Sequence, residues 1–172
     1  MYKRILVPLD GSVQGNKGLD EAVRLASEHG GQIRLIHVLN RAPLASPDIT
    51  SSRFDRLFEQ MHEDGNLLLS RAGAYARKAG VPVDGKLVYA TAGDPSDFVA
   101  QEARTWPADI VVCGTHARRG LMRVLLGSEG EQIVRHSPVP VLLVPTPAPP
   151  AKRARGRTTI RQLGGVTPNR AI

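Results

Sequence analysis

A stretch in the second half of the chain combines small residues with basic side chains, as anion-binding loops do. It runs from Gly114 to Ser128, and its basic or potentially basic residues are His116, Arg118, Arg119 and Arg123. Small residues at 114, 117 and 127 let backbone N–H groups come close to an anion. A helix is expected to begin at Ser128, and the partial positive charge at its N-terminus adds to the attraction. The stretch therefore predicts a phosphate site.

The start of this helix also has an interpretation that needs no ligand. Ser128 and Glu131 have the S-x-x-E spacing of a capping box. In such a box the two side chains satisfy unpaired backbone N–H groups and stabilise the helix by ~1 kcal/mol. Ser128 can thus cap the helix, bind phosphate or do both, and the sequence leaves these alternatives open.

Other signatures of nucleotide or catalytic chemistry are absent or incomplete. No G-x-G-x-x-G follows the first apolar run, and residues 80–87 miss the P-loop pattern because Leu87 replaces the Ser or Thr that binds Mg²⁺. The histidines lack the HExxH and HxH spacings of metal ligands. We find no clear general base and no carboxylate pair for Mg²⁺, so we predict no metal site and no substantial catalysis. A role for Mg²⁺ with a bound nucleotide stays open.

Five apolar runs alternate with four helical patterns, and these elements must position the phosphate site. The runs expected to form strands cover residues 4–9, 33–38, 81–90, 108–114 and 139–144. Helical spacing is found at residues 19–29, 53–79, 94–105 and 128–136. Strands that alternate with helices predict an α/β fold with a mostly parallel sheet.

The positive charge is concentrated at the C-terminal end of the chain. The 172 residues carry a net charge of +7, with a pI near 10.2. Residues 146–172 hold six basic and no acidic side chains, which leaves +1 for residues 1–145. The length fits one domain, which we assign to residues 1–145. We expect residues 146–172 to form a basic, Pro/Arg-rich tail that is extended or disordered.

The composition also predicts where the protein is found. No run approaches the ~18 apolar residues that a membrane span needs. The first residues lack the apolar core of a signal peptide, because the run from Ile5 to Leu9 stops at Asp10. A single cysteine fits a reducing compartment. We therefore expect a soluble, cytoplasmic protein without a membrane span.

Three segments in order resemble the universal stress protein family. They are ILVPLDGS at 5–12, HV at 37–38 and the long string at 114–144, and the similarity covers about residues 3–145. The resemblance implies a doubly wound, mostly parallel five-stranded sheet of order 3-2-1-4-5 with helices on both faces, as in adenine nucleotide alpha hydrolase-like proteins. The loops after the first and fourth strands then meet at the topological switch point, where such sheets bind ligands.

The resemblance also implies which residues would hold a nucleotide. ATP-binding members carry G-x2-G-x9-G-[S/T], and Gly114, Gly127 and Ser128 match this pattern, whereas Ala117 replaces its middle glycine. In the family, Pro8, Asp10 and Val38 would contact the adenosine; Asp10 could also merely anchor its own turn. The implied binding residues are Pro8, Leu9, Asp10, Val38, Gly114, Thr115, His116, Ala117, Gly127, Ser128 and Glu129.

Two functional hypotheses follow. The first is a universal stress protein that binds ATP or senses nucleotides in the stress response and forms a homodimer through the edge strand Val139–Val144. The alternative is an interaction protein of the same fold that binds no nucleotide. Ala117 adds a methyl group where phosphate should approach, and Glu129 puts a carboxylate in the first helical turn. The basic tail would then dock an acidic protein or nucleic acid.

Overall fold

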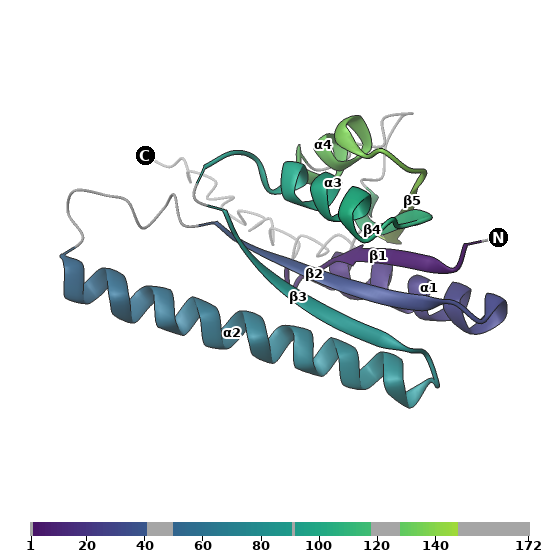
Figure 1. The fold of residues 1–172 in the computed structure, drawn as a ribbon, viewed down its shortest axis with the longest axis horizontal. Coiled ribbons are helices and arrows are strands. Elements are labelled where there is room, and N and C mark those ends of the chain that lie inside the picture. Colours follow the sequence, from purple (N-terminus) through teal and green to yellow (C-terminus); the bar gives the residue numbers. More distant parts are fainter. Residues whose placement is uncertain (1, 41–49, 91, 118–127, 148–172) are drawn as a thin grey trace, which may run out of the picture.

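The computed structural model describes residues 2–40, 50–90, 92–117 and 128–147. Its centre is a five-stranded parallel sheet in the order β3-β2-β1-β4-β5 (Figure 1). The strands are β1 (Arg4–Pro8), β2 (Gln32–Asn40), β3 (Val83–Ala90), β4 (Ile110–Ala117) and β5 (Val141–Pro147). The helices are α1 (Val13–His29), α2 (Ser51–Lys78), α3 (Pro95–Thr105) and α4 (Ser128–His136). The predicted doubly wound fold and its strand order are confirmed.

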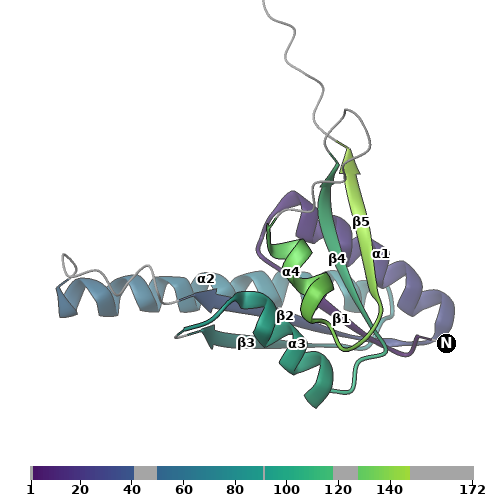
Figure 2. The ribbon, with the colours of Figure 1, turned by 90° about the horizontal axis from the view of Figure 1, so that it is seen from above.

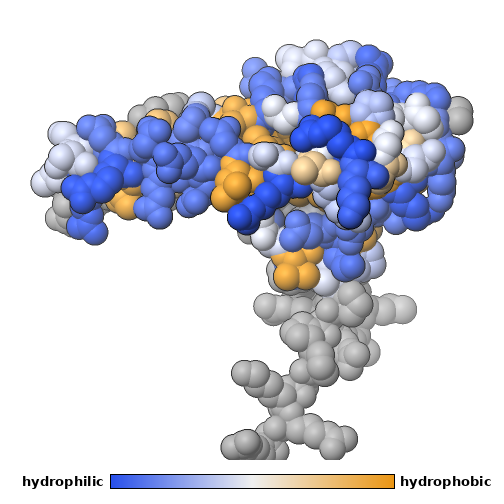
Figure 3. Space-filling model, turned by 90° about the horizontal axis from the view of Figure 1, so that it is seen from below, coloured by the Kyte–Doolittle hydropathy of each residue, from blue (hydrophilic) through white to orange (hydrophobic). Residues whose placement is uncertain are grey.

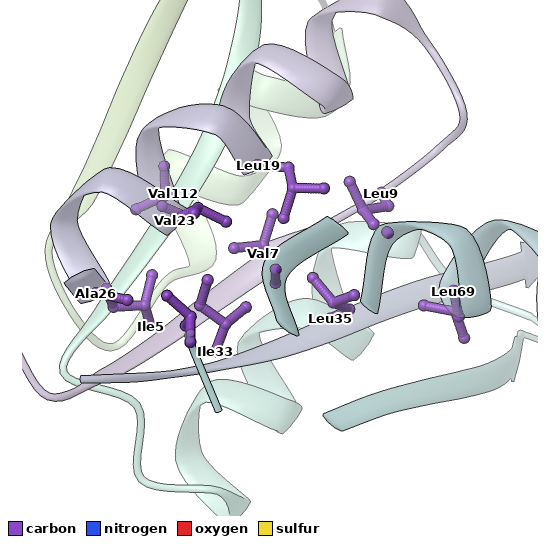
Figure 4. Close-up of a cluster of buried hydrophobic side chains, with 14 of the residues drawn as sticks. Ile5, Val7, Leu9, Leu19, Val23, Ala26, Ile33, Leu35, Leu69 and Val112 are labelled. Atoms are coloured by element: carbon purple, nitrogen blue, oxygen red, sulfur yellow. The ribbon is translucent and has the colours of Figure 1, made fainter. Parts of the chain in front are cut away.

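Two apolar clusters lie on opposite faces of the sheet. Helices α1 and α2 cover the first cluster, and α3 and α4 cover the second. Ile5 and Val7 of β1 belong to the first cluster together with Leu19 of α1 (Figure 4). Leu6, between them in the sequence, belongs to the second cluster because successive side chains of a strand point to opposite faces. Both faces of the central strands are thus buried, as a parallel sheet requires.

Helix α2 extends beyond the sheet as an arm (Figure 2). Its buried residues all lie between Gly65 and Ala76, in its second half. The first half carries Phe54 and Phe58, whose rings stack with centroids 6.2 Å apart, and Phe58 lies 5.5 Å from the ring of Tyr89 in β3. Figure 3 shows this arm on a face of the molecule that is mostly hydrophilic and has only separate apolar patches. The contact of Phe58 with Tyr89 thus joins the first half of α2 to the edge strand β3.

The ends of β4 and β5 differ from the prediction. The two strands pair as far as Ala117 with Pro147, so β4 does not end at residue 114. β5 begins at Val141 rather than 139, since Pro140 has no N–H to donate to a ladder. The carbonyl of Pro140 instead accepts a hydrogen bond from the Val111 N–H at 3.0 Å. Thr146 and Pro147, which we assigned to the tail, belong to the sheet; the rest of the predicted tail, 148–172, lies outside the described residues.

A buried carboxylate connects α3 to the sheet. Glu102 of α3 is only 4% exposed and accepts a hydrogen bond from Arg34 Nη1 at 3.0 Å, and it also forms an ion pair with Lys86. Arg34 of β2 binds Asp84 as well, and its guanidinium carbon lies 4.8 Å from the centroid of the Trp106 ring. The hydrogen bond with Asp84 is the main cause that raises the pKa of Arg34. The cation therefore stays charged between the two strands and the helix.

We expect Glu102→Ala to lower the free energy of unfolding by about 2 kcal/mol, because two cations lose a buried acceptor. The control is Glu28→Ala, which removes an exposed pair with Arg24 in α1 and should change stability by less than ~1 kcal/mol. Urea unfolding of both variants measures the difference. Equal, small effects would show that the buried carboxylate contributes no more than a surface ion pair.

Candidate functional site

A cleft opens at the C-terminal edge of the sheet, where β1 and β4 separate. These strands pair only through Ile5 with Ile110 and Leu6 with Val111, whereas β1 pairs with β2 along its whole length. The first loop then leads to α1 on one face, while α3 and α4 lie on the other face. This is the topological switch point, at which doubly wound sheets bind ligands.

Six of the residues selected from the sequence line this cleft. They are Pro8, Leu9, Asp10, Val38, Gly114 and Thr115. The structure thus brings together segments that are more than 100 residues apart in the chain. Their contact with a nucleotide stays a prediction.

The other selected residues lie near the same edge or outside the described part of the chain. His116 and Ala117 are the last two residues of β4, not part of a loop after residue 114, because they pair with β5. Ser128 and Glu129 begin α4 as predicted. The side chains of these four residues, and all of Gly127, lie outside the described structure.

Helices α3 and α4 supply lining residues that the sequence analysis missed. These residues are Pro95, Ser96, Val99, Gly130 and Ile133. No motif marks them, because they reach the cleft only when two helices pack over the same face of β4. Asp94, which caps α3, was the available signal, since an N-cap indicates that a helix begins at that edge of the sheet.

Asp10 organises the turn between β1 and α1. Its Oδ1 accepts a hydrogen bond from the Ser12 N–H at 2.9 Å, and the Ser12 hydroxyl in turn accepts one from the Gly15 N–H at 2.9 Å. A Cβ atom on Gly15 would lie 2.8 Å from Asp10 Oδ1. Asp10 therefore anchors its own turn, which is the structural role considered from the sequence. The same turn places the Asp10 carboxylate at the cleft.

His37 holds the ends of β1 and β2 together. Its Nδ1 lies 2.6 Å from the carbonyl oxygen of Leu9, which can only accept, so Nδ1 donates. The Leu9 N–H donates to the carbonyl of Ile36 at 2.9 Å. The HV pair at 37–38 thus includes one residue that fixes the edge of the cleft and one, Val38, that lines it.

Gly114 has a packing role that does not involve a ligand. A Cβ atom at this position would lie 1.8 Å from the carbonyl oxygen of Gln14 in α1. Gly18 of α1 has the reciprocal restriction, since its Cβ would lie 2.8 Å from the Gly114 nitrogen. The two glycines let the helix backbone contact the strand backbone. This backbone contact requires glycine at position 114. The requirement is independent of the predicted approach of an anion.

A polar group joins α3 to the end of α4 beside the cleft. His136 Nδ1 lies 3.1 Å from Ser96 Oγ and 3.4 Å from Asp97 Oδ1. Hydrogen bonds from the Ser96 side chain and from its backbone N–H lower the pKa of Asp94. Because one ring nitrogen makes both histidine contacts, this group is not a Ser-His-Asp triad, in which two nitrogens are used.

Two further observations concern metal sites and membrane spans among the described residues. No three His, Cys, Asp or Glu side chains come together there as a metal ion would require. In the same part of the chain, no helix is long and apolar enough to cross a membrane.

Comparisons with known proteins agree with the fold. The model of the universal stress protein family matches residues 1–145. A universal stress protein of Methanocaldococcus jannaschii is 29% identical over 147 residues, which cover 86% of this chain and 84% of that protein. One from Bacillus subtilis is 28% identical over 150 residues, covering 84% and 99%.

Solved structures of universal stress proteins have the same fold as this chain. A universal stress protein family structure from Burkholderia pseudomallei has a TM-score of 0.69 at 28% identity and covers 84% of this chain and 97% of its own. The fold is also shared with an Arabidopsis thaliana family member with AMP bound (TM-score 0.60, 20% identity, covering 83% and 91%) and with a universal stress protein in complex with cAMP (0.58, 23%, covering 84% and 98%). With this fold, and with a family match over residues 1–145, the chain belongs to the universal stress protein family.

Proposed function

We propose that this chain binds an adenine nucleotide, with ATP as the expected ligand, in the cleft between β1 and β4. The observation that carries the proposal is the convergence of Asp10 and Val38 with Gly114 and the first turn of α4 at one switch point. Family members of the same fold have been solved with AMP and with cAMP, which supports this class of ligand.

The two sides of the cleft differ in the chemistry they offer. Pro8 and Val38 provide an apolar surface for the base, and the Asp10 carboxylate can accept hydrogen bonds from ribose hydroxyl groups. Gly130 places the start of α4 on the other side, where backbone N–H groups and the helix dipole favour phosphate. Adenosine would thus lie near β1 and β2, and the phosphates near β4 and α4.

The protein would act as a nucleotide sensor in a stress response, without substantial catalysis. Beside the cleft, His136 contacts the Ser96 hydroxyl and the Asp97 carboxylate, and Ser96 hydrogen-bonds to Asp94, the N-cap of α3. This arrangement holds α3 and α4 together. His37 Nδ1 is engaged by a backbone carbonyl. Neither arrangement resembles an activated nucleophile with its base.

Self-association and location form part of the proposal. β5 is an edge strand, and its apolar residues Val141–Val144 are only half-buried. Such an edge is prone to pairing with another strand, so we propose a cytoplasmic homodimer in which two β5 strands meet. The predicted alternative, a tail that docks an acidic partner, rests on residues 148–172 outside the described structure and stays a prediction.

Calorimetric titration with ATP, with and without Mg²⁺, tests nucleotide binding. The wild type, Glu129→Val and Ala117→Gly should be compared. We expect the wild type to bind ATP. Binding by a variant alone would show that Glu129 or Ala117 closes the site in this protein, and silence of all three would contradict the proposal.

A further inference from the structure

The arm, residues 51–64 of α2, carries a stripe of four side chains with a cation at one end, two apolar groups in the middle and an anion at the other end. The stripe consists of Arg53, Leu57, Met61 and Asp64. Spacings of four, four and three residues place all of them on one side of the helix. The two charged residues are exposed and the two apolar ones are partly exposed. Within the part of the chain that the structure describes, no ion pair holds Arg53 or Asp64.

This stripe is turned away from the contact between α2 and the sheet. The rings of Phe58 and His62 lie against that of Tyr89 in β3, with centroids 5.5 and 6.0 Å away. Phe58 follows Leu57 and His62 follows Met61 by one residue, which is a rotation of about 100° around the helix axis. The arm also extends beyond the sheet (Figure 2). The stripe is therefore a separate surface, not part of the packing against β3.

The order of its side chains makes the stripe complementary to itself. When two identical arms pack side by side in opposite directions, a two-fold axis brings Arg53 of each copy to Asp64 of the other. The same arrangement brings Leu57 against Met61. Parallel arms would instead place Arg53 against Arg53 and Asp64 against Asp64, and like charges repel.

Charge complementarity is what selects the partner. Two partly exposed apolar residues alone would need no explanation, since single surface hydrophobic residues are common. Here they are flanked at one end by a cation and at the other by an anion, 11 residues apart in the sequence. Complementary charges fix the register and exclude wrong partners, and the surface that matches this order of groups is the same stripe on a second copy.

We propose that two copies of this chain pack their arms antiparallel along this stripe. The inference does not rest on the proposed nucleotide site, because the stripe and the cleft share no residue. It also goes beyond the pairing proposed for β5, since β3 and β5 lie at opposite edges of the sheet. The stripe is only ~16 Å long, so we expect weak association by the arms alone, strengthened where the copies are also held together elsewhere.

Disulfide trapping in the full chain tests both the contact and its direction. The variant carries Arg53→Cys and Asp64→Cys together. Within one helix these positions are about 16 Å apart, too far for an intramolecular disulfide, whose Cα atoms lie roughly 4.4–6.8 Å apart. We expect mild oxidation to give a covalent dimer on a non-reducing gel, because each introduced thiol meets the other position on the second copy. The native Cys113 is buried and is present in every variant.

Three control variants define what the cross-link means. Arg53→Cys alone and Asp64→Cys alone should give no dimer, because antiparallel arms keep identical positions far apart. Ser52→Cys with Glu63→Cys has the same spacing at exposed positions on another side of the helix and should also give none. Circular dichroism should show that all variants are folded, since each substituted residue is exposed.

Charge reversal tests the ion pairs without oxidation. Arg53→Glu and Asp64→Arg should each weaken self-association by about 2- to 30-fold, the range for two exposed ion pairs per dimer. Both changes in one chain restore the pairs with opposite signs, and association should return to the wild-type level. Arg56→Glu, an exposed charge off the stripe, should have no effect. Sedimentation velocity over a concentration series measures all four variants.

Other outcomes would overturn the inference. Absence of a covalent dimer in the double cysteine variant would show that the arms do not meet along the stripe. A dimer from Arg53→Cys alone would show parallel arms, and equal trapping by the Ser52 and Glu63 pair would show random collision. If the charge-swapped chain associates no better than either single reversal, Arg53 and Asp64 do not pair, and the stripe belongs to a different partner.

Discussion

Gly114→Ala is expected to lower the free energy of unfolding by about 3 kcal/mol or more, at or above the upper end of overpacking costs. The added Cβ would lie 1.8 Å from the carbonyl oxygen and 2.3 Å from the carbonyl carbon of Gln14. Both are backbone atoms, so no side-chain rotation relieves the overlap and α1 must move away from β4. For a chain of this size, the loss corresponds to a decrease in Tm of roughly 6–12 °C.

The matched control is Gly85→Ala in β3. Its Cβ would meet the Cβ of Leu69 at 3.5 Å, which is an ordinary van der Waals distance. Alanine also restricts the unfolded chain more than glycine, so stability should be unchanged or slightly higher. Thermal unfolding of both variants gives the comparison. Similar Tm values for Gly114→Ala and the wild type would refute a backbone contact between α1 and β4.

Replacing Asp10 is expected to have the largest effect on nucleoside binding. Asp10→Ala removes the acceptor of the Ser12 N–H, which should reduce stability by about 1 kcal/mol. It also removes the carboxylate that we expect to accept from the ribose, and adenosine affinity should fall by about 10- to 100-fold. Asp10→Asn keeps an oxygen for the Ser12 N–H, so it should retain wild-type stability and still bind adenosine more weakly.

Adenosine and ATP separate the two roles of this carboxylate. The loss for ATP should be smaller than that for adenosine, because removal of the Asp10 charge also reduces repulsion of the phosphates. Asp20→Asn, which alters an exposed ion pair with Lys17 in α1, is the control and should leave binding unchanged. If Asp10→Asn binds adenosine as the wild type does, Asp10 only anchors the turn.

The alternation of strands and helices was readable from the sequence because each element carries its own pattern. The helix Ser128–His136 has the predicted bounds, and Gly30 ends α1 in the left-handed conformation at φ 59°. The ends of β4 and β5 were not readable, since Thr115–Ala117 and Pro145–Pro147 have no apolar run. They are strands because they pair with each other, a contact between distant parts of the chain.

In the candidate site, too, some residues could be predicted from the sequence and others could not. Pro8, Asp10 and Val38 stood out because they belong to segments that resemble a known family and follow strand ends. Ser96 and Ile133 did not stand out, because nothing in their own neighbourhoods indicates that α3 and α4 cover the end of β4. A motif is local in the chain, whereas the wall of a cleft is assembled from several segments.

By itself, the sequence determined the α/β class and the concentration of positive charge after residue 145, and its resemblance to a family predicted the sheet edge at which a ligand is expected. These properties depend on residue type and on short spacings. Only the tertiary structure decided that Gly114 faces the backbone of α1 and that the Thr115 hydroxyl is buried without a partner. Steric exclusion and hydrogen-bond satisfaction depend on which distant atoms surround a residue, and folding alone brings those atoms together.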